Sequence, residues 1–313
     1  MMEELKILVI RFSSIGDIVL TSPVLRLLNS SKKYEVHFLT KNEYYSLVSE
    51  NPNIHKIHLL KESLKNIFFD LKKENFDFII DLHNNIRSNI LTFMLFKKTF
   101  KLKKSLFNKT NNIHIVERYL LALKKLQIKN DNLGLDFFLS KELEKKFNYN
   151  ENFIAWCIGS KHDNKKLSAN KILEVSNAIN YPIIFIGGSD DIEIADYILN
   201  QSSNEKIKNF CGSLSIQETA TIIKNCNLLI TNDTGFMHIG ASFKIPIISL
   251  WGCTKPDLGY TPYQTNNHSI YIVSEKYVNS CHRYGKKCRS KTKCIDYIST
   301  QKLKQAIELI FCK

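Results

Sequence analysis

The chain has no long apolar run, no internal repeat and no glycine-rich dinucleotide fingerprint. No apolar stretch approaches the roughly 18 residues that a membrane-spanning helix needs. The amino terminus, MMEELKILVIRF, places acidic residues before a very short apolar strand, which is unlike a secretory signal. We therefore expect a cytosolic protein, in which the eight cysteines are reduced thiols.

The turn after the first apolar run contains a single glycine, Gly16. A G-x-G-x-x-G motif is absent there, which argues against a nicotinamide or flavin enzyme. We also find no helix-turn-helix, zinc-finger or RNA-binding signature, and the lysines are not ordered into a recognition helix. These absences disfavour a nucleic-acid partner.

What the sequence has in excess is positive charge. There are 44 Lys and Arg residues against 30 Asp and Glu, a net charge of +14. Such a balance favours acidic partners, such as anionic lipid, phosphorylated substrates or nucleic acid. A general Lys and Asn bias explains much of the lysine content but not its clustering. The densest cluster, Lys97–Lys104, has five lysines and no acid, with Phe96, Phe100 and Phe107 interleaved; we expect it to meet the membrane, unless it is only a solvated face.

At 313 residues, two domains of about 150 residues are expected. Short apolar runs bounded by polar turns alternate with helical patterns, which predicts an α/β fold of doubly wound parallel sheets. In the first half we expect strands at residues 5–10, 35–39, 57–60 and 78–81 and helices near residues 43–49, 63–73 and 113–126. The polar turn at residues 81–88 should open a further helix that runs to about residue 96. Ser22-Pro23 predicts a kink or restart in the first helix.

The second half repeats the alternation. We expect strands at residues 153–158, 183–186, 228–231, 247–250 and 270–273 and helices at residues 168–179, 192–200, 215–226, 236–243 and 300–311. Charge replaces the apolar pattern around residues 130–149, so this stretch is interpreted as a linker between domains 1–150 and 151–313. The prediction is two Rossmann-like domains facing across a cleft, and it leaves open whether the last helix packs back on the first domain.

The turn Asn232–Gly235 organises the second half. It lies where a predicted strand ends and a helix begins, the place at which open α/β sheets bind ligands and where exposed amides suit a phosphate. Asp233 or Thr234 can cap the helix, Gly235 allows close approach of a ligand, and His238 follows one turn later. An ordinary capped turn with a core histidine is the alternative.

Further polar turns end other strands. Arg11 and Asp17 follow the first strand, and Lys161, Lys165 and the Gly187-Gly188 turn follow strands of the second half. Lysines beside a helix start suit a diphosphate, and a lone carboxylate suits a general base. Together they indicate transfer from a nucleotide-activated donor to a hydroxyl. Equally, Asp17 could only cap its helix, and the lysines could form a solvated loop.

The sequence also resembles a known family. Two signatures carry the resemblance, Ile10-Arg-Phe-Ser-Ser-Ile-Gly-Asp17-Ile-Val-Leu-Thr-Ser-Pro23 and Asn232-Asp-Thr-Gly-Phe-Met-His238, followed by Phe243-Lys-Ile-Pro246 and Trp251-Gly-Cys-Thr254. They are similar to glycosyltransferase family 9, the ADP-heptose:lipopolysaccharide heptosyltransferases, which have the two-domain GT-B fold. The resemblance covers nearly the whole chain.

The resemblance implies roles for individual residues. Asp17 corresponds to the catalytic base of an inverting displacement, which needs neither a metal nor another cofactor. The donor site would comprise Lys165, Asp191, Asp233, Thr234, Gly235 and His238. Leu167 and Ser168 depart from the family pattern, so either Lys165 or Lys166 could face the phosphates, and Glu193 is the alternative to Asp191.

Looser matches at residues 81–88 and 114–119 imply an acceptor site. Its expected residues are Arg11, Ser14, His83, Arg87 and Arg118. The implied partners are a nucleotide-diphosphate sugar, with ADP-heptose preferred, and an anionic lipid-linked saccharide at the inner face of the cytoplasmic membrane. The alternatives are another nucleotide-diphosphate sugar as donor and, from a different class, a nucleic-acid-binding protein without enzymatic activity.

Cys281, Cys288 and Cys294 are spaced as C-x6-C-x5-C in a basic stretch, with His282 nearby. Zinc sites favour C-x2-C pairs, which this stretch lacks. The resembled family often has a cysteine three residues before the first, where this chain has Val278. We therefore interpret the three cysteines as unpaired thiols and expect no metal.

Overall fold

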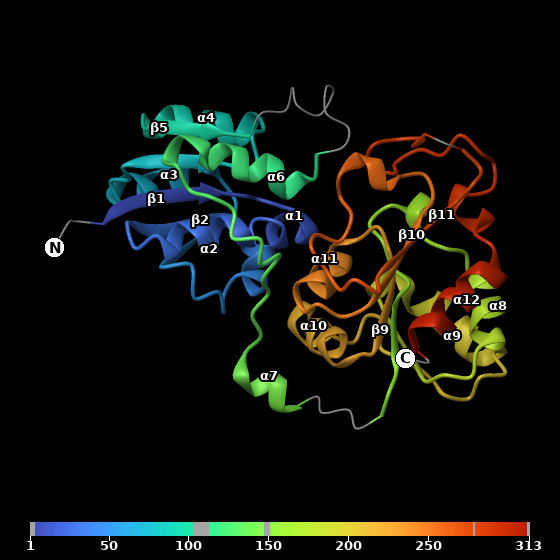
Figure 1. The fold of residues 1–313 in the computed structure, drawn as a ribbon. Helices are drawn as coiled ribbons and strands as arrows, with labels where there is room; N and C mark the ends of the chain where they lie inside the picture. The colour runs from blue at the N-terminus through green and yellow to red at the C-terminus, as the bar shows by residue number, and fades with distance from the viewer. Residues whose placement is uncertain (1–3, 103–112, 147–150, 278, 312–313) are drawn as a thin grey trace. The chain divides into compact units, whose positions relative to one another are not determined.

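The computed structural model describes residues 4–102, 113–146, 151–277 and 279–311. The chain divides into two compact units, residues 1–138 and 139–313 (Figure 1). The division falls inside the predicted linker and before the expected boundary at residue 150. A short helix explains the earlier position, because α7 (Lys141–Lys146) packs against α10 (Ile216–Asn225) of the second unit.

The first unit contains a five-stranded parallel sheet. Its strands are β1 (Leu5–Ile10), β2 (Tyr34–Lys41), β3 (Lys56–Leu60), β4 (Phe78–Asp81) and β5 (Lys98–Lys101). Their order, β3-β2-β1-β4-β5, reverses direction between β1 and β4. Ile10 pairs with Asp81 at that point, so the polar turns that follow the two strands are neighbours.

Helices flank this sheet (Figure 1). They are α1 (Ile15–Val19), α2 (Ser22–Ser30), α3 (Leu64–Lys73), α4 (Ile86–Leu95) and α6 (Ile115–Leu120), with 3-10 turns η1 (Asn42–Leu47) and η2 (Leu121–Leu126). The restart at Ser22-Pro23 is confirmed, since Pro23 occupies the first turn of α2. The helix expected at residues 43–49 is instead the 3-10 turn η1, which buries only Leu47.

The second unit contains a six-stranded parallel sheet. Its strands are β6 (Ile154–Cys157), β7 (Ile183–Ile186), β8 (Ile207–Asn209), β9 (Leu228–Asn232), β10 (Ile247–Trp251) and β11 (Ile270–Val273). The order β11-β10-β9-β6-β7-β8 reverses between β6 and β9. Both sheets are therefore doubly wound, as predicted.

The second sheet is covered on both faces (Figure 1). Its helices are α8 (Ala169–Ala178), α9 (Ile192–Gln201), α10, α11 (Gly235–Ser242) and α12 (Thr300–Phe311). The last helix, α12, packs against α8 and buries Leu303 and Ile307 in the core of the second unit. Within the described residues, no helix is long and apolar enough to cross a membrane.

Two short edge strands were not predicted. β5 lies in the lysine cluster, of which Lys103 and Lys104, like Phe107, lie outside the described residues. β8 has only three residues, one of them buried. Lysine is a usual residue of exposed sheet edges. Because both strands are short and polar, their composition does not distinguish them from loops.

Two buried histidines make the first unit sensitive to acid. His37 Nδ1 on β2 lies 2.9 Å from His58 Nε2 on β3. Burial, reinforced by the charge of His37, lowers the pKa of His58 from 6.5 to about 4. Between these two pKa values the unfolded chain binds a proton at His58 that the folded protein does not, so the free energy of unfolding falls as the pH falls from 6.5 to about 4. Below about pH 4, His58 causes no further loss of stability.

His58→Gln should therefore lose less stability on acidification than the wild type. One pKa unit corresponds to about 1.4 kcal/mol. Between about pH 7 and pH 4.5, the free energy of unfolding of the wild type should therefore fall by about 2 kcal/mol more than that of the variant. Urea unfolding at a series of pH values measures this difference. Parallel profiles for the two proteins would contradict the assignment.

Candidate active site

The turns after β1 and β4 bring together the first cluster of predicted site residues. Arg11 donates from Nη1 to the carbonyl of Leu82 at 2.7 Å and from Nε to the carbonyl of Ser13 at 2.8 Å. These bonds join the two turns at the point where the strand order reverses, which is where open α/β sheets place their ligands. The guanidinium is therefore held by backbone from both strands.

Asp17 lies in the first turn of α1 and faces this guanidinium. Its Oδ1 is 2.7 Å from Arg11 Nη2. Ser14 donates to Oδ2 from its hydroxyl at 3.0 Å and from its backbone amide at 3.4 Å. The hydroxyl of Tyr119 on α6 donates to Oδ1 at 3.4 Å. The structure thus unites Arg11, Ser14 and Asp17, and it adds Tyr119, which the sequence reading did not single out as a site residue.

The surroundings of Asp17 keep it ionised. Burial by itself would raise the pKa of this carboxyl, but the charge of Arg11 and the hydrogen bonds from Ser14 outweigh burial and lower the pKa below its ordinary value. About a fifth of the side chain, 22%, remains exposed. Asp17 is therefore an accessible carboxylate at neutral pH, as a proton acceptor must be.

The other predicted acceptor residues have different environments. His83 lies beside Phe12, with ring centroids 5.0 Å apart, and Arg118 is buried on α6. Arg87 is exposed and lines a cavity of 180 Å³ together with Lys41, Lys61 and Glu62. That basic cavity suits an anionic group, whereas the buried Arg118 suits a supporting role.

Asp81 positions the second turn from the buried end of β4. Its Oδ1 accepts from the backbone amides of His83 and Asn84 at 3.0 and 2.8 Å, and its Oδ2 accepts from the hydroxyl of Ser88 at 2.7 Å. The carboxylate therefore shapes the turn and the start of α4 rather than facing solvent.

In the second unit, the equivalent point is the junction of β6 and β9. Cys157 pairs with Thr231 at the strand ends, and Asn232 donates from Nδ2 to the carbonyls of Ile158 and Gly159 at 3.0 and 3.2 Å. Asn232 is fully buried and ties the two turns together. The start of α11 is thereby held at the switch point of the sheet, where its amides suit an anion.

Lys165 contacts this turn directly. Its Nζ is 2.6 Å from Asp233 Oδ2 and 3.4 Å from the carbonyl of Asp233. The Lys165 stem is covered by Gly285, at which a Cβ would lie 2.7 Å from Lys165 Cε. Because Gly285 also has a positive φ of 71°, both space and backbone conformation favour glycine there.

Lys166 has a different partner, Asp191, with 2.6 Å between Nζ and Oδ1. Asp191 is buried and its Oδ2 accepts from the amide of Gly188 at 2.9 Å. A Cβ on Gly159 or Gly187 would clash with the same carboxylate. Asp191 and Lys166 therefore form a buried pair beneath the turns, whereas Lys165 reaches the α11 turn itself.

The remaining residues predicted for the donor site lie around the start of α11. Thr234 is the N-cap residue, its hydroxyl lies 3.2 Å from that of Thr231, and Gly235 begins the helix. His238 is buried, only 3% exposed. Nearby, burial and then the charges of Lys165, Lys161 and Lys286 lower the pKa of His162.

Comparison with known proteins adds independent information. The sequence profile of glycosyltransferase family 9 (heptosyltransferase) matches residues 65–296, well over half of the chain. The chain belongs to this family. It is 26% identical to lipopolysaccharide heptosyltransferase 1 of Campylobacter coli, a match that covers 89% of this chain and 92% of the relative.

Solved structures of the family show the same fold. The chain is similar to the glycosyl transferase family 9 protein of Veillonella parvula, with a TM-score of 0.84, 22% identity and coverage of 100% and 99% of the two chains. It is also similar to E. coli heptosyltransferase WaaC with ADP-2-deoxy-2-fluoro heptose, with a TM-score of 0.74, 15% identity and coverage of 97% and 99%. This family member is thus a glycosyltransferase with two Rossmann-like domains of the GT-B fold.

Three features of these sites were not predicted. Tyr119 lies within the loose match at residues 114–119, but nothing in its spacing indicates a bond to Asp17. Both Lys165 and Lys166 have acidic partners, although only one lysine was expected to face the donor. Cys253, quoted in the Trp251–Thr254 signature, lies next to Cys281, Cys288 and Cys294. The sequence hides this grouping because 27 residues separate Cys253 from Cys281.

Proposed function

We propose that this protein transfers a heptose from ADP-heptose to an anionic, lipid-linked saccharide acceptor in assembly of the lipopolysaccharide inner core. The observation that carries the proposal is the Lys165–Asp233 pair at the start of α11, at the switch point of the second sheet. A diphosphate presents charge for both the ammonium and the helix amides. Support comes from the lipopolysaccharide heptosyltransferase of C. coli and from WaaC with a heptose donor analogue.

In the proposed reaction, Asp17 acts as the general base. The acceptor hydroxyl oxygen attacks the anomeric carbon of the heptose while the bond from that carbon to the ADP oxygen breaks with inversion. Asp17 takes the proton of the hydroxyl, and ADP leaves with the electron pair. Lys165 and the amides at the start of α11 stabilise the negative charge that develops on the leaving diphosphate.

Asp233 is assigned to the sugar rather than to the phosphates. An anionic carboxylate repels phosphate but accepts hydrogen bonds from sugar hydroxyls. When the diphosphate takes up the ammonium of Lys165, the carboxylate of Asp233 becomes available for those hydroxyls. The existing 2.6 Å ion pair is thus a contact that the donor would replace.

Donor preference tests the proposal. We expect ADP-heptose to raise the melting temperature more than ADP-glucose, ADP, or a UDP- or GDP-sugar, and to support transfer to a heptose-deficient lipopolysaccharide acceptor. A site fitted to heptose leaves polar groups unpaired with a hexose, at about 1–3 kcal/mol for each buried group. Faster transfer from a UDP- or GDP-sugar would overturn the donor assignment.

Asp233→Ala should narrow the difference in affinity between ADP-heptose and ADP. The variant loses the acceptor for sugar hydroxyls, while its freed Lys165 ammonium should bind ADP at least as tightly as before. Calorimetric titration with both ligands measures the two affinities. An unchanged ratio between them would place the sugar elsewhere.

A surface of the first unit supports the membrane partner. Ile86, Ile90 and Phe93 follow one another at helical spacing along α4 and are all exposed, as are Met94 and Phe96. Phe96 is 90% exposed, and Lys97, Lys98 and Lys101 follow within the next five residues. Apolar side chains next to lysines suit an interface with anionic lipid, which the apolar side chains enter while the ammonium groups meet the headgroups.

Replacing Lys97, Lys98 and Lys101 by glutamine should release the protein from anionic vesicles at moderate salt. Each lysine near anionic lipid contributes about 1 kcal/mol, so partitioning should fall by about 100-fold. The matched control replaces the exposed lysines 206, 208 and 302 of the second unit by glutamine, with the same loss of charge. Equal sedimentation with vesicles for the two triple variants would leave the α4 surface without this role.

A further inference from the structure

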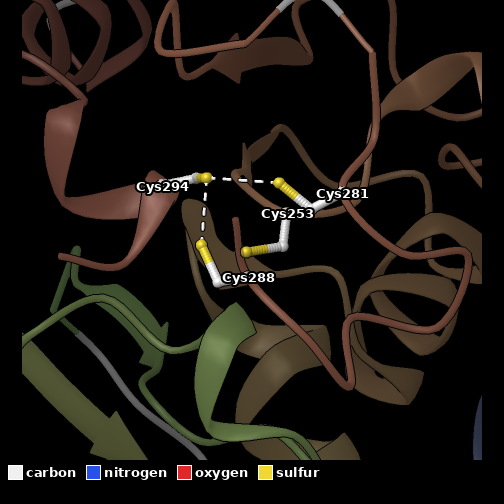
Figure 2. Close-up of side chains that lie close together, drawn as sticks. All are labelled: Cys253, Cys281, Cys288 and Cys294. Carbon is white, nitrogen blue, oxygen red and sulfur yellow. Dashed lines mark hydrogen bonds between the residues drawn. The ribbon is translucent and has the colours of Figure 1, made fainter. Parts of the chain in front are cut away.

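Four cysteine sulfurs converge in the second unit, and none of these cysteines is proposed to take part in the reaction. The Sγ atoms of Cys253, Cys281, Cys288 and Cys294 all lie within 4.8 Å of one another. Figure 2 shows these four side chains grouped together with their sulfur atoms turned inward. Cys253 and Cys294 are buried, and Cys281 and Cys288 are half-buried. The earlier interpretation of three unpaired thiols did not include the fourth.

The separations between sulfurs match metal ligands better than disulfides. Cys294 Sγ lies 3.1 Å from Cys288 Sγ and 3.5 Å from Cys281 Sγ. A disulfide requires about 2.0 Å. Four thiolates around a zinc ion, each at about 2.3 Å, lie roughly 3.8 Å from one another in a tetrahedron. A small inward or outward adjustment therefore gives every sulfur the same distance to one central ion.

The backbone brings the four ligands from separate parts of the chain to one place. Cys253 follows β10, and its carbonyl accepts from the amide of Cys281 at 2.8 Å. Cys294 begins a 3-10 turn, η6 (Cys294–Tyr297), and a Cβ on Gly252 would lie 2.6 Å from the backbone nitrogen of Ile295. The end of β10 is thus packed directly against η6, so the cluster does not depend on one exposed loop alone.

The surrounding charge is suited to a metal thiolate. Four thiolates around a divalent ion carry a net charge of −2, which needs nearby cations. Between Cys281 and Cys294 the chain has six cationic residues and no acid, Arg283, Lys286, Lys287, Arg289, Lys291 and Lys293. This composition offsets the negative charge that the site would carry.

We propose that Cys253, Cys281, Cys288 and Cys294 form a tetrathiolate site for one metal ion of the class that accepts tetrahedral sulfur coordination, zinc or iron. Four protein ligands leave no open position, so the ion is structural. The absence of a C-x2-C pair does not exclude this metal site, because its ligands come from three separate chain segments rather than from two C-x2-C turns.

The site has a structural consequence for the donor lysine. The segment between Cys281 and Cys288 contains Gly285, which covers the stem of Lys165. Asn164 donates to the carbonyl of Lys286 at 3.2 Å, and Lys293 pairs with Asp163 at 2.8 Å. A metal ion that anchors this segment at both ends holds the cover of Lys165 in place.

Metal content of the untagged, full-length protein tests the proposal. After purification without chelators, mass spectrometry of the elements should find one zinc or iron ion per chain. Visible absorption distinguishes the two metals, since an iron tetrathiolate is coloured and a zinc one is not. Cobalt exchanged into the site should show the intense visible bands of tetrahedral thiolate coordination.

Cys288→Ser should abolish stoichiometric metal binding and lower the melting temperature. The matched control is Cys226→Ser, which replaces a buried cysteine outside the cluster. This variant should retain the metal ion at the four-cysteine site. If Cys288→Ser does not fold, a mercurial reagent applied to the wild type decides instead, because metal should be released in step with modification of four thiols.

The proposal fails if the reduced wild type neither retains nor takes up zinc or iron, if Cys288→Ser keeps a full complement, or if disulfides join these cysteines in the freshly purified protein. None of these measurements depends on sugar transfer, so they test the site separately from the proposed function.

Discussion

Asp17→Asn is expected to lower turnover by at least about 10²-fold, the usual scale for loss of a general base. Asparagine retains one oxygen, which can still accept from Arg11 in place of Oδ1, but its amide group cannot take a proton and loses the oxygen that accepts from Ser14. Arg11 keeps its bonds to the carbonyls of Leu82 and Ser13, so the turn should survive the change. Initial rates of transfer under saturating donor measure the effect.

Binding measurements separate loss of the base from loss of the fold. The variant should bind ADP with nearly wild-type affinity, because the residues proposed for ADP lie in the other unit. Asp70→Asn, an exposed carboxylate on α3, is the matched control and should leave turnover unchanged. Near-normal turnover of Asp17→Asn would remove this carboxylate from the mechanism.

Lys165→Ala is expected to weaken ADP binding by about 10- to 100-fold and to slow transfer. A hydrogen bond to a charged group contributes about 1.5–3 kcal/mol, and the ammonium would make such bonds to the diphosphate. Lys165 contacts the α11 turn itself, and its partner Asp233 is less buried than Asp191, with 13% against 5% of the side chain exposed, so its removal should affect ligand binding more, and folding less, than removal of Lys166.

Lys166→Ala is the matched control, and it should affect folding more than ligand binding. Its removal leaves the Asp191 carboxylate, whose side chain is 5% exposed, without a countercharge. Breaking a buried pair in this way costs roughly 3–5 kcal/mol, so the melting temperature should fall while the folded fraction still binds ADP. If only the Lys166 variant loses ADP affinity at full stability, the roles of the two lysines must be exchanged.

Much of the fold could be predicted because most of the parallel strands are short, continuous apolar runs, and because the helices carry an apolar stripe toward the core. The predicted bounds of β1, β4, β7, β11 and α12 are confirmed residue for residue. The failures are elements without such a signal. η1 has no apolar stripe, β5 and β8 are polar edge strands, and α7 lies within a charged stretch that resembles a linker.

The sequence alone determined where the polar turns lie that are proposed for the chemistry. Each strand in these sheets ends in a local pattern of apolar run, polar turn and helix start, and parallel strands present those turns at one edge. That reasoning placed Arg11 with Asp17 and located Asp233 at the start of a helix without knowledge of any contact.

Only the tertiary structure decided which side chains meet. Tyr119 reaches Asp17 across 102 positions, Lys165 reaches Asp233 across 68, and Lys166 reaches Asp191 across 25. Cys253 joins its three partners for the same reason. Local periodicity records which face of an element is buried, whereas the order of the strands and the crossings between them determine what lies opposite that face.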